Sequence, residues 1–374
     1  MRAILCICAI VLATLSPGCF ADSTTYPPLP ALNLDVTQTS VSGLSSGGYM
    51  AVQLGVAYSS IIKGVGVVGG GPYYCAQDSL LIATTKCSCT ILPPGVCAVT
   101  PTSTDVPALV SFTKASSASH SIDAATNIAA QRVITISGAD DTTVPWPVVT
   151  QLQAYYAALG VPAQNVSAIE LANAGHTMPT LNYGVPCAKT ESPFIGKCQF
   201  DGAKAILGWL YGPDPLAPPA ASTKKGSYIR FDQSLYVPAG PASGFTWTTG
   251  MDTTGWLYVP AACNAGNAGG PCRLHIVLHG CEQGQDYLPL DSPSPPGGGL
   301  LFGTTFVRHA GYAQWADNNR IVLLFPQAVS IPGLNPNGCW DWWGYTGAHF
   351  ADQQGVQMRA IRNMIDRLVS GATH

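Results

Sequence analysis

The sequence predicts an α/β fold in which a mostly parallel sheet is covered by helices on both faces. Segments with the pattern of strands alternate with segments that have the pattern of helices along most of the chain. The strand candidates are short and apolar, as in residues 132–137 (RVITIS) and 321–325 (IVLLF). Such runs are typical of parallel strands that are buried on both faces of a sheet. The first candidate strand, residues 35–42, runs directly into a glycine-rich turn and then into a helix.

The expected elements follow one another in a regular order. We expect strands at residues 35–42, 63–69, 132–137, 166–171, 228–237, 255–259, 274–278 and 321–325, and helices at residues 49–58, 147–159, 201–211, 304–318 and 351–369. The glycines of residues 63–69 suit close packing. Residues 70–105 contain four cysteines and no clear periodicity, which indicates an insertion held by disulfides. The proline-rich residues 213–226 form the best candidate boundary.

The first 21 residues have the features of a signal peptide. Arg2 supplies a positive charge, residues 3–15 are apolar but short for a bilayer, and residues 19–21 (CFA) resemble a cleavage site. We therefore expect an exported mature chain that begins near Asp22. The alternatives are a retained membrane anchor and a lipoprotein attached at Cys19, for which the usual leucine three positions earlier is absent. No later stretch is long and apolar enough to cross a membrane, so we expect no membrane contact once the signal is removed.

Cysteine content and charge narrow the class of protein. Of 13 cysteines, three lie in the signal peptide, and the ten that remain are an even number in a chain bound for an oxidising compartment. This favours disulfides over metal ligands. We expect two local pairs, Cys187 with Cys198 and Cys263 with Cys272. Charged residues make up only 10% of the chain and the net charge is −3, which excludes a basic face for nucleic acid.

A serine motif follows the first candidate strand. Residues 43–47 read Gly-Leu-Ser-Ser-Gly, a G-x-S-x-G sequence between a strand and a helix. This is the context of a nucleophile elbow, in which Ser45 occupies a strained turn and the helix N-terminus behind it favours developing negative charge. Because the chain has 40 glycines, the motif alone can arise by chance. The strand-to-helix context is what makes Ser45 the candidate nucleophile.

Candidates for the acid and the base follow later strands. Asp141 comes after residues 132–137 and would hold the tautomer of a histidine and stabilise the imidazolium. The neighbouring Asp140 is its rival, and both could instead be turn residues or helix caps. His176 follows the next strand and would carry the proton from the serine to the leaving alcohol, the alternative being a structural histidine. The order Ser, Asp, His along the chain is that of the α/β-hydrolase fold.

The oxyanion hole predicts how the chain is connected. One donor is expected to be the backbone N–H of Ser46, and the other normally follows an early strand. Too little chain precedes Ser45 to hold that strand, but residues 274–281 (LHIVLHGC) have its pattern, more than 200 residues downstream. An ordinary strand-ending turn is the alternative. We therefore expect a circularly permuted α/β-hydrolase, with residues 22–374 forming a single domain joined near residues 213–226.

These motifs resemble the polyhydroxybutyrate (PHB) depolymerase family. The resemblance rests on SGLSSGGYM at residues 42–50, on the acid and histidine loops, on LHGC at residues 278–281 and on GCWDWWGY at residues 338–345. It covers essentially the whole mature chain and implies the permuted catalytic domain of that family. Carried over to this sequence, it implies the triad Ser45, Asp141 and His176 and the backbone oxyanion donors Ser46 and Cys281.

The resemblance implies further roles as well. Cys281 and Cys339 match a cysteine pair that ties the oxyanion loop to the Trp-rich loop. Trp343 matches an aromatic residue that lines the cleft against the polymer. Core packing is the alternative for Trp340, Trp342 and Trp343, and we expect it of at least one, since three large aromatic residues in four positions cannot all face one way. Without a linker and polymer-binding domain after the catalytic domain, the chain resembles single-domain members, including periplasmic ones that prefer amorphous polymer.

The expected function follows from these implications. We expect a monomeric serine esterase, secreted or periplasmic, that hydrolyses the ester bonds of poly(3-hydroxybutyrate) or its oligomers through an acyl-enzyme. It is expected to need no metal and no organic cofactor. The alternatives are a secreted carboxylesterase for small or aromatic esters, which would use the same residues, and a catalytically silent protein that binds polymer through the Trp-rich loop.

Overall fold

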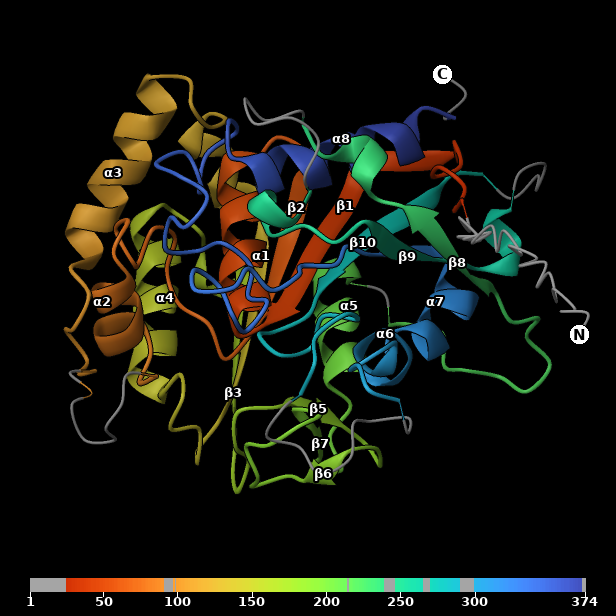
Figure 1. Cartoon of the computed structure of the whole chain (residues 1–374), viewed down its shortest axis with the longest axis horizontal. Helices are drawn as coiled ribbons and strands as arrows, with labels where there is room; N and C mark the ends of the chain where they lie inside the picture. The colour runs from red at the N-terminus through yellow and green to blue at the C-terminus, as the bar shows by residue number, and fades with distance from the viewer. Residues whose placement is uncertain are drawn as a thin grey trace, which may run out of the picture.

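The computed structural model describes residues 25–90, 97, 99–213, 215–238, 246–264, 270–289 and 299–371. The expected signal peptide, residues 1–21, lies outside these described residues. The described residues form an α/β fold built on a sheet of eight strands, with a small three-stranded sheet beside it (Figure 1). The mostly parallel sheet with helices on both faces, predicted from the sequence, is therefore present.

The large sheet has the candidate serine strand at its centre. Its strands span Leu34–Leu44 (β1), Ile62–Val68 (β2), Arg132–Gly138 (β3), Val166–Leu171 (β4), Ser227–Asp232 (β8), Thr254–Val259 (β9), Cys272–Leu278 (β10) and Ile321–Phe325 (β11). Their order across the sheet is β4-β3-β2-β1-β10-β11-β9-β8. The first six run parallel, whereas β9 is antiparallel to both β11 and β8. The small sheet consists of Met178–Thr180 (β5), Val185–Pro186 (β6) and Ile195–Lys197 (β7).

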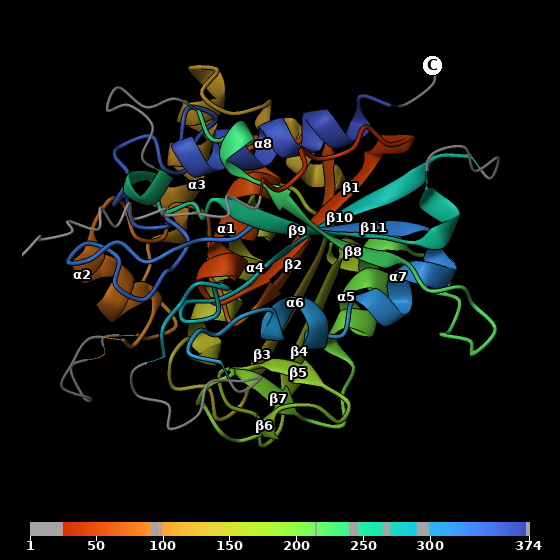
Figure 2. The same ribbon diagram turned by 45° about the vertical axis from the view of Figure 1, so that its right-hand side comes forward.

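Helices bury the two faces of the large sheet in two apolar clusters (Figures 1 and 2). One face carries α1 (Ser46–Ala57), α3 (Val106–Ala118), α4 (Trp146–Ala158) and α8 (Val356–Val369), and the other carries α5 (Gly202–Tyr211), α6 (Thr305–His309) and α7 (Ala313–Asn319). Shorter helical turns are α2 (Leu80–Ile82), Ala83–Cys87, Ala125–Ala130, Ala163–Asn165, Ser234–Tyr236, Thr246–Thr249 and Ala261–Cys263. Glycines of β2 allow close packing, since a Cβ on Gly66 would lie 2.8 Å from Cγ2 of Ile206 on α5.

Several elements differ from the sequence-based expectation. The helix expected at residues 304–318 is two helices, α6 and α7, because the chain turns at Gly311 with a φ of 91°. The strand expected at residues 228–237 ends at Asp232. A 3₁₀ turn begins at Ser234. The C-terminal helix begins at Val356, not at residue 351. The pattern predicts neither α3 nor the small sheet, whose strands of two or three residues are too short to show a period.

The two ends of the described chain meet. The amide of Leu32, just before β1, donates to the carbonyl oxygen of Leu368 on α8 at 2.8 Å. The proline-rich segment is attached to α7 instead, because the amide of Ala217 donates to Oδ1 of Asn319 and that of Gly226 donates to Oδ1 of Asp317, both at 2.8 Å. Within the described ranges, every helix is too short or too polar to traverse a bilayer.

Candidate active site

Ser45 occupies the turn between β1 and α1, at the carboxyl end of the central strand. Its backbone angles, φ 56° and ψ −121°, lie in a region that a side chain rarely adopts, so the turn is strained. The Ser45 amide donates to the carbonyl oxygen of Val68 on β2 at 2.9 Å. A strained strand-to-helix turn is the geometry that exposes a nucleophilic serine at the carboxyl ends of the strands of a sheet.

The two glycines of the motif allow three segments to meet behind Ser45. A Cβ on Gly43 would lie 2.2 Å from the carbonyl oxygen of Gly47. A Cβ on Gly47 would lie 2.4 Å from the carbonyl oxygen of His279, in the loop after β10. Only glycine therefore lets β1, α1 and the loop after β10 approach one another here. The same contacts bring residues 279–281 next to the serine.

His176 and Asp141 form a buried pair. Nδ1 of His176 lies 2.7 Å from Oδ2 of Asp141, and each residue is 5% exposed. The other carboxylate oxygen of Asp141 accepts the amides of Thr143 at 2.9 Å and Val144 at 2.8 Å. Nε2 of His176 has no hydrogen-bond partner among the described residues. Because Ser45 and His176 line the same cavity, Nε2 is the nitrogen available to a serine proton.

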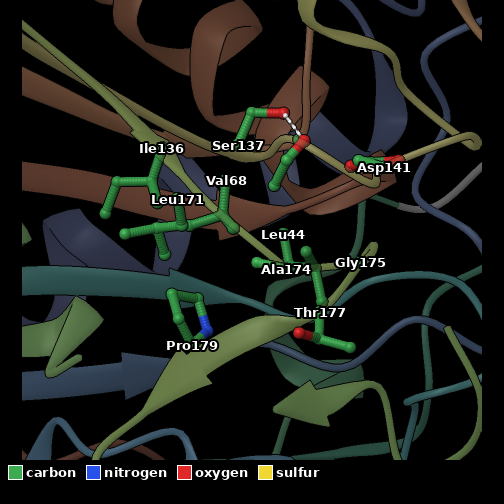
Figure 3. Close-up of a pocket in the computed structure, with 12 residues that line it drawn as sticks. Leu44, Val68, Ile136, Ser137, Asp141, Leu171, Ala174, Gly175, Thr177 and Pro179 are labelled. Carbon is green, nitrogen blue, oxygen red and sulfur yellow. Dashed lines mark hydrogen bonds between the residues drawn. The ribbon is translucent and has the colours of Figure 1, made fainter. Parts of the chain in front are cut away.

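The surroundings of this pair leave it little freedom. Gly69 has a φ of 54°, and a Cβ there would lie 2.8 Å from Cε1 of His176. The amide of His176 donates to Oγ1 of Thr190 at 2.8 Å. A small cavity of about 10 Å³ lies beside Asp141. Asp141 and Thr177 are among the residues that line it (Figure 3). The histidine ring is therefore held by its carboxylate partner, by its backbone and by a close glycine.

Two backbone amides beside Ser45 are candidates for oxyanion donors. Ser46 is the first residue of α1, where an N–H has no carbonyl partner within the helix. In the loop after β10, the amide of Gly280 is already bound to Oε1 of Gln283 at 2.7 Å. The next amide, that of Cys281, has no backbone acceptor among the described residues. Cys281 and Ser45 both line the cavity, so the Cys281 amide is the second candidate donor.

His279 controls the peptide that carries this second donor. Its Nε2 accepts the amide of Ala328 at 3.0 Å, so the ring proton is on Nδ1. Nδ1 then donates to the carbonyl oxygen of Gly280 at 2.7 Å. Because the carbonyl and the N–H of one peptide point in opposite directions, this bond also sets the direction of the Cys281 N–H. Complete burial lowers the pKa of His279 to about 4, so the ring is neutral at pH 7.

A cavity of about 490 Å³ opens beside Ser45. Its lining includes Leu80 and Thr90 of the cysteine-rich insertion, and Leu334 and Trp343 from residues 333–343. Tyr49 and Trp342 stack in the lining with ring centroids 4.0 Å apart. Most of the lining is apolar or uncharged, which suits a neutral ester chain. Among the described residues, no cluster of His, Cys, Asp or Glu side chains could hold a metal ion.

The three tryptophans of the Trp-rich loop differ in their surroundings. Trp340 is completely buried and its Nε1 donates to the carbonyl oxygen of His279 at 3.0 Å, so it packs in the core. Trp342 and Trp343 line the cavity. The buried carboxylate of Asp341 organises this turn, since it accepts the amides of residues 343–346 at 2.8–3.3 Å.

Disulfides connect the loops that surround the cavity. Cys281 is bonded to Cys339, which ties the oxyanion loop to the Trp-rich loop. Cys187 is bonded to Cys198 and Cys263 to Cys272, the two pairings expected from their short separations. The first of these closes the segment that follows His176. Two further bonds lie in the insertion, Cys75–Cys87 and Cys89–Cys97.

A second serine–histidine cluster and the rival acid Asp140 are less suited to catalysis. Oγ of Ser42 lies 2.8 Å from Nε2 of His275, and Oγ of Ser40 lies 2.7 Å from Nδ1 of the same ring. All three residues are completely buried and none lines the cavity, and burial lowers the pKa of His275 to about 3. This serine–histidine cluster is a closed structural network. Asp140, the rival acid, is exposed to solvent, whereas Asp141 contacts the histidine.

Sequence reasoning missed several residues that shape this site. Gln283 accepts an amide of the loop after β10, Thr190 accepts the amide of His176, and Tyr49 lines the cavity. They act through contacts between loops that are distant in the sequence, which periodicity does not report. Tyr49 alone carried a signal, because it lies two residues after the G-x-S-x-G motif.

The chain is similar to known proteins, although no family model matches it. It is 43% identical over 344 residues to a poly(3-hydroxybutyrate) depolymerase of Delftia acidovorans, covering 92% of this chain but only 62% of that protein. It is 37% identical over 357 residues to a polyhydroxybutyrate depolymerase of Talaromyces funiculosus, covering 92% of this chain and 93% of that one.

Solved structures agree with these relatives. The crystal structure of a PHB depolymerase from Penicillium funiculosum superposes with a TM-score of 0.77 at 35% identity, over 92% of this chain and 100% of that one. A PHB depolymerase complexed with an R3HB trimer gives the same values. Two curated relatives and two solved structures therefore agree, and this chain belongs to the polyhydroxybutyrate depolymerase family of serine carboxylic ester hydrolases.

Proposed function

We propose that this protein hydrolyses the ester bonds of poly(3-hydroxybutyrate) or its oligomers, with Ser45 as the nucleophile. The observation that carries the proposal is that Ser45, His176 and Cys281 line one cavity, while Asp141 holds the buried ring of His176. The family relatives support the substrate class, and the cavity lining of aromatic, aliphatic and uncharged polar residues suits an uncharged polyester chain.

The proposed reaction has two steps. Nε2 of His176 takes the proton of Ser45, and Oγ attacks the ester carbonyl while the amides of Ser46 and Cys281 stabilise the oxyanion. Collapse breaks the bond to the alkoxide, which takes the proton from His176 and leaves as an alcohol. Water then gives a proton to His176 and attacks the acyl-enzyme, which releases a carboxylic acid and restores Ser45. Asp141 holds the ring and stabilises the imidazolium in both steps.

We also propose that residues 22–374 form one circularly permuted domain. If the chain is read from β8 through α8 and then from β1 to β4, the strand that precedes the oxyanion loop becomes the third, the place that loop has in the α/β-hydrolase fold. The hydrogen bond from Leu32 to Leu368 supports this reading, because it brings the end of α8 to the start of β1. The segment 213–226 is then the join between the former ends.

Export to an oxidising compartment is part of the proposal. Five disulfides link all ten cysteines from Cys75 onward, a density typical of secreted and periplasmic proteins. The proposed form is a monomer that acts on the polymer without a metal or an organic cofactor.

Clearing of polymer suspensions tests the function. Purified wild-type protein is compared with Ser45→Ala on amorphous and on crystalline poly(3-hydroxybutyrate), with a short p-nitrophenyl ester as a second substrate. Clearing by the wild type alone supports the proposal, and the preferred suspension reports whether the single domain suffices for crystalline polymer. If neither suspension clears but the short ester is cleaved, the protein is a small-ester carboxylesterase. If the wild type shows neither activity, the protein is a catalytically silent polymer-binding protein.

A further inference from the structure

Gln283 is a buried side chain in the loop after β10, next to the backbone that adjoins the nucleophile. It is 1% exposed, and its Oε1 accepts the amide of Gly280 at 2.7 Å. Gly280 itself packs against the nucleophile, since a Cβ on Gly280 would lie 3.4 Å from Cβ of Ser45. Gln283 therefore holds a peptide that touches Ser45, although it belongs neither to the proposed triad nor to the proposed oxyanion hole.

The acceptor half of Gln283 determines which N–H of this loop can meet an oxyanion. Gly280 and Cys281 supply two successive backbone amides beside Ser45. Because Oε1 of Gln283 binds the Gly280 amide, that N–H is not available to a substrate. The Cys281 amide has no backbone acceptor among the described residues. Occupation of the first amide thus leaves the second as the donor of the loop.

The donor half of Gln283 reaches a different segment, which follows His176 in the chain. Nε2 of Gln283 donates to the carbonyl oxygen of Pro193 at 2.9 Å and to that of Phe194 at 3.3 Å. The Phe194 carbonyl also accepts the amide of Met178 at 2.9 Å, and Met178 lies two residues after His176. One carbonyl oxygen is therefore shared by the strand that follows the histidine and by the side chain of Gln283.

The same segment holds His176 by a second contact. The Cys187–Cys198 disulfide closes the segment, and Oγ1 of Thr190 within it accepts the amide of His176 at 2.8 Å. Phe194 and Thr190 both line the substrate cavity. A movement of this segment would therefore displace the proposed general base and part of the cavity lining together. The two hydrogen bonds of Gln283 Nε2 oppose such a movement.

The bonding of Gln283 leaves one orientation for its amide group. A reversed amide would place Oε1 against two carbonyl oxygens and the NH₂ group against the N–H of Gly280. We propose that Gln283 is a positioning residue for ester hydrolysis. It selects the Cys281 N–H as the oxyanion donor and couples the loop that carries this donor to the segment that holds His176. This inference rests on the proposed function of the site.

A matched control for Gln283 is present elsewhere in the fold. Gln233 is completely buried, its Oε1 accepts the amide of Gln327 at 2.9 Å, and its Nε2 donates to the carbonyl oxygens of Asp252 and Gln327, both at 2.8 Å. Its amide group thus makes the same set of bonds as that of Gln283, one accepted from a backbone amide and two donated to backbone carbonyls. Gln233 is not among the described residues that line the cavity. A loss that arises only from broken buried bonds should therefore be similar at both positions.

The first test removes all three bonds. Gln283→Met and Gln233→Met are compared with the wild type and Ser45→Ala on a short p-nitrophenyl ester, and urea unfolding shows that each protein is folded in the assay. We expect kcat of Gln283→Met to fall by about 10²-fold, the lower end of the loss caused by removal of one oxyanion donor. Gln233→Met is less stable than the wild type but keeps its kcat.

The second test separates the two halves of the amide. In Gln283→Glu the ionised carboxylate still accepts the Gly280 amide but directs its other oxygen at two carbonyl oxygens, whereas the protonated acid restores one donor. Burial raises the pKa of such a glutamate above its usual 4.3. The kcat of Gln283→Glu relative to the wild type should therefore fall as the pH rises from about 5 to about 9. His176 titrates in both proteins, so this ratio reports residue 283. Gln233→Glu shows no such trend.

The outcomes separate the inference from the function on which it rests. If folded Gln283→Met keeps the wild-type kcat, or if Gln283→Glu and Gln233→Glu both follow the wild-type pH profile, the role of Gln283 is wrong while the proposed function stands. If Gln283→Met does not fold, the pH profile of Gln283→Glu decides, because its protonated form retains bonds to both segments. If Ser45→Ala cleaves the ester as fast as the wild type, the proposed function is wrong and the inference is lost with it.

Discussion

The imidazole of His279 donates from Nδ1 to the carbonyl oxygen of Gly280 at 2.7 Å and thereby fixes the peptide that carries the N–H of Cys281, the proposed oxyanion donor. The acceptor on the other side of the ring is Nε2, which is bound by the amide of Ala328. A completely buried histidine that never touches the substrate thus connects β10, β11 and the proposed oxyanion donor.

The His279 contact predicts a loss of turnover. In His279→Ala the Gly280–Cys281 peptide is free to rotate, so one oxyanion donor is misdirected and kcat for a short ester falls by about 10²- to 10³-fold. KM changes little, because the cavity walls remain. His349→Ala, at a side chain that is 59% exposed, is the control and keeps wild-type kinetics. A rise in KM with an unchanged kcat would contradict the role assigned to His279.

The two adjacent aspartates are predicted to differ sharply. Asp141→Asn leaves the shape of the side chain but removes the charge that orients His176, and we expect kcat to fall by about 10⁴-fold. Asp140→Asn, one residue away and exposed, should keep most of the activity. Steady-state kinetics on a p-nitrophenyl ester compare the two directly, with circular dichroism to verify folding. Equal losses in both variants would remove Asp141 from the proposed mechanism.

Acid is predicted to destabilise the fold through buried histidines. Burial lowers the pKa of His275 to about 3 and that of His279 to about 4, well below the value of about 6.5 in an unfolded chain. Their stabilising effect is complete above pH 6.5 and is lost as the pH falls towards 4, because the unfolded chain then binds protons that the folded one does not. Burial and Asp286 raise the pKa of Asp252 to about 6, which partly offsets this effect.

Urea unfolding at pH 5 and at pH 7 measures the sign of the change in the free energy of unfolding. Two histidines outweigh one aspartate, so the free energy of unfolding should be about 2 kcal/mol lower at pH 5 than at pH 7. Unfolding should also take up protons between these values. A free energy of unfolding that stays constant or rises towards pH 5 would show that the histidines are not buried in their neutral form.

The sequence predicted the centre of this molecule better than its margins. Residues 132–137 and 321–325 are short apolar runs. Both faces of such a strand are buried only when helices cover the sheet on both sides, so the pattern predicted these strands and their place in the sheet. Gly43 and Gly47 made the strained turn at Ser45 predictable from the sequence. The structure has no room for a Cβ at either position. Helix α3 was missed since its serine-rich sequence lacks a strong apolar stripe.

The proposed site shows the same division. Ser45, Asp141 and His176 each follow a recognisable strand, so a pattern of elements was enough to propose them. Gln283 and Thr190 act through loops that meet only in three dimensions. Their roles depend on which backbone amides they accept across those loops. This property is not encoded in local periodicity.

The cavity joins residues from opposite ends of the polypeptide, and this has a consequence for the order of events in the cell. Ser45 is made early, but Cys281, Cys339 and Trp343 are synthesised in the last third of the chain. A nascent chain that has only passed Ser45 therefore lacks the second proposed oxyanion donor and the aromatic lining. The proposed site is complete only after Cys281, Cys339 and Trp343 have been synthesised and folded back beside Ser45.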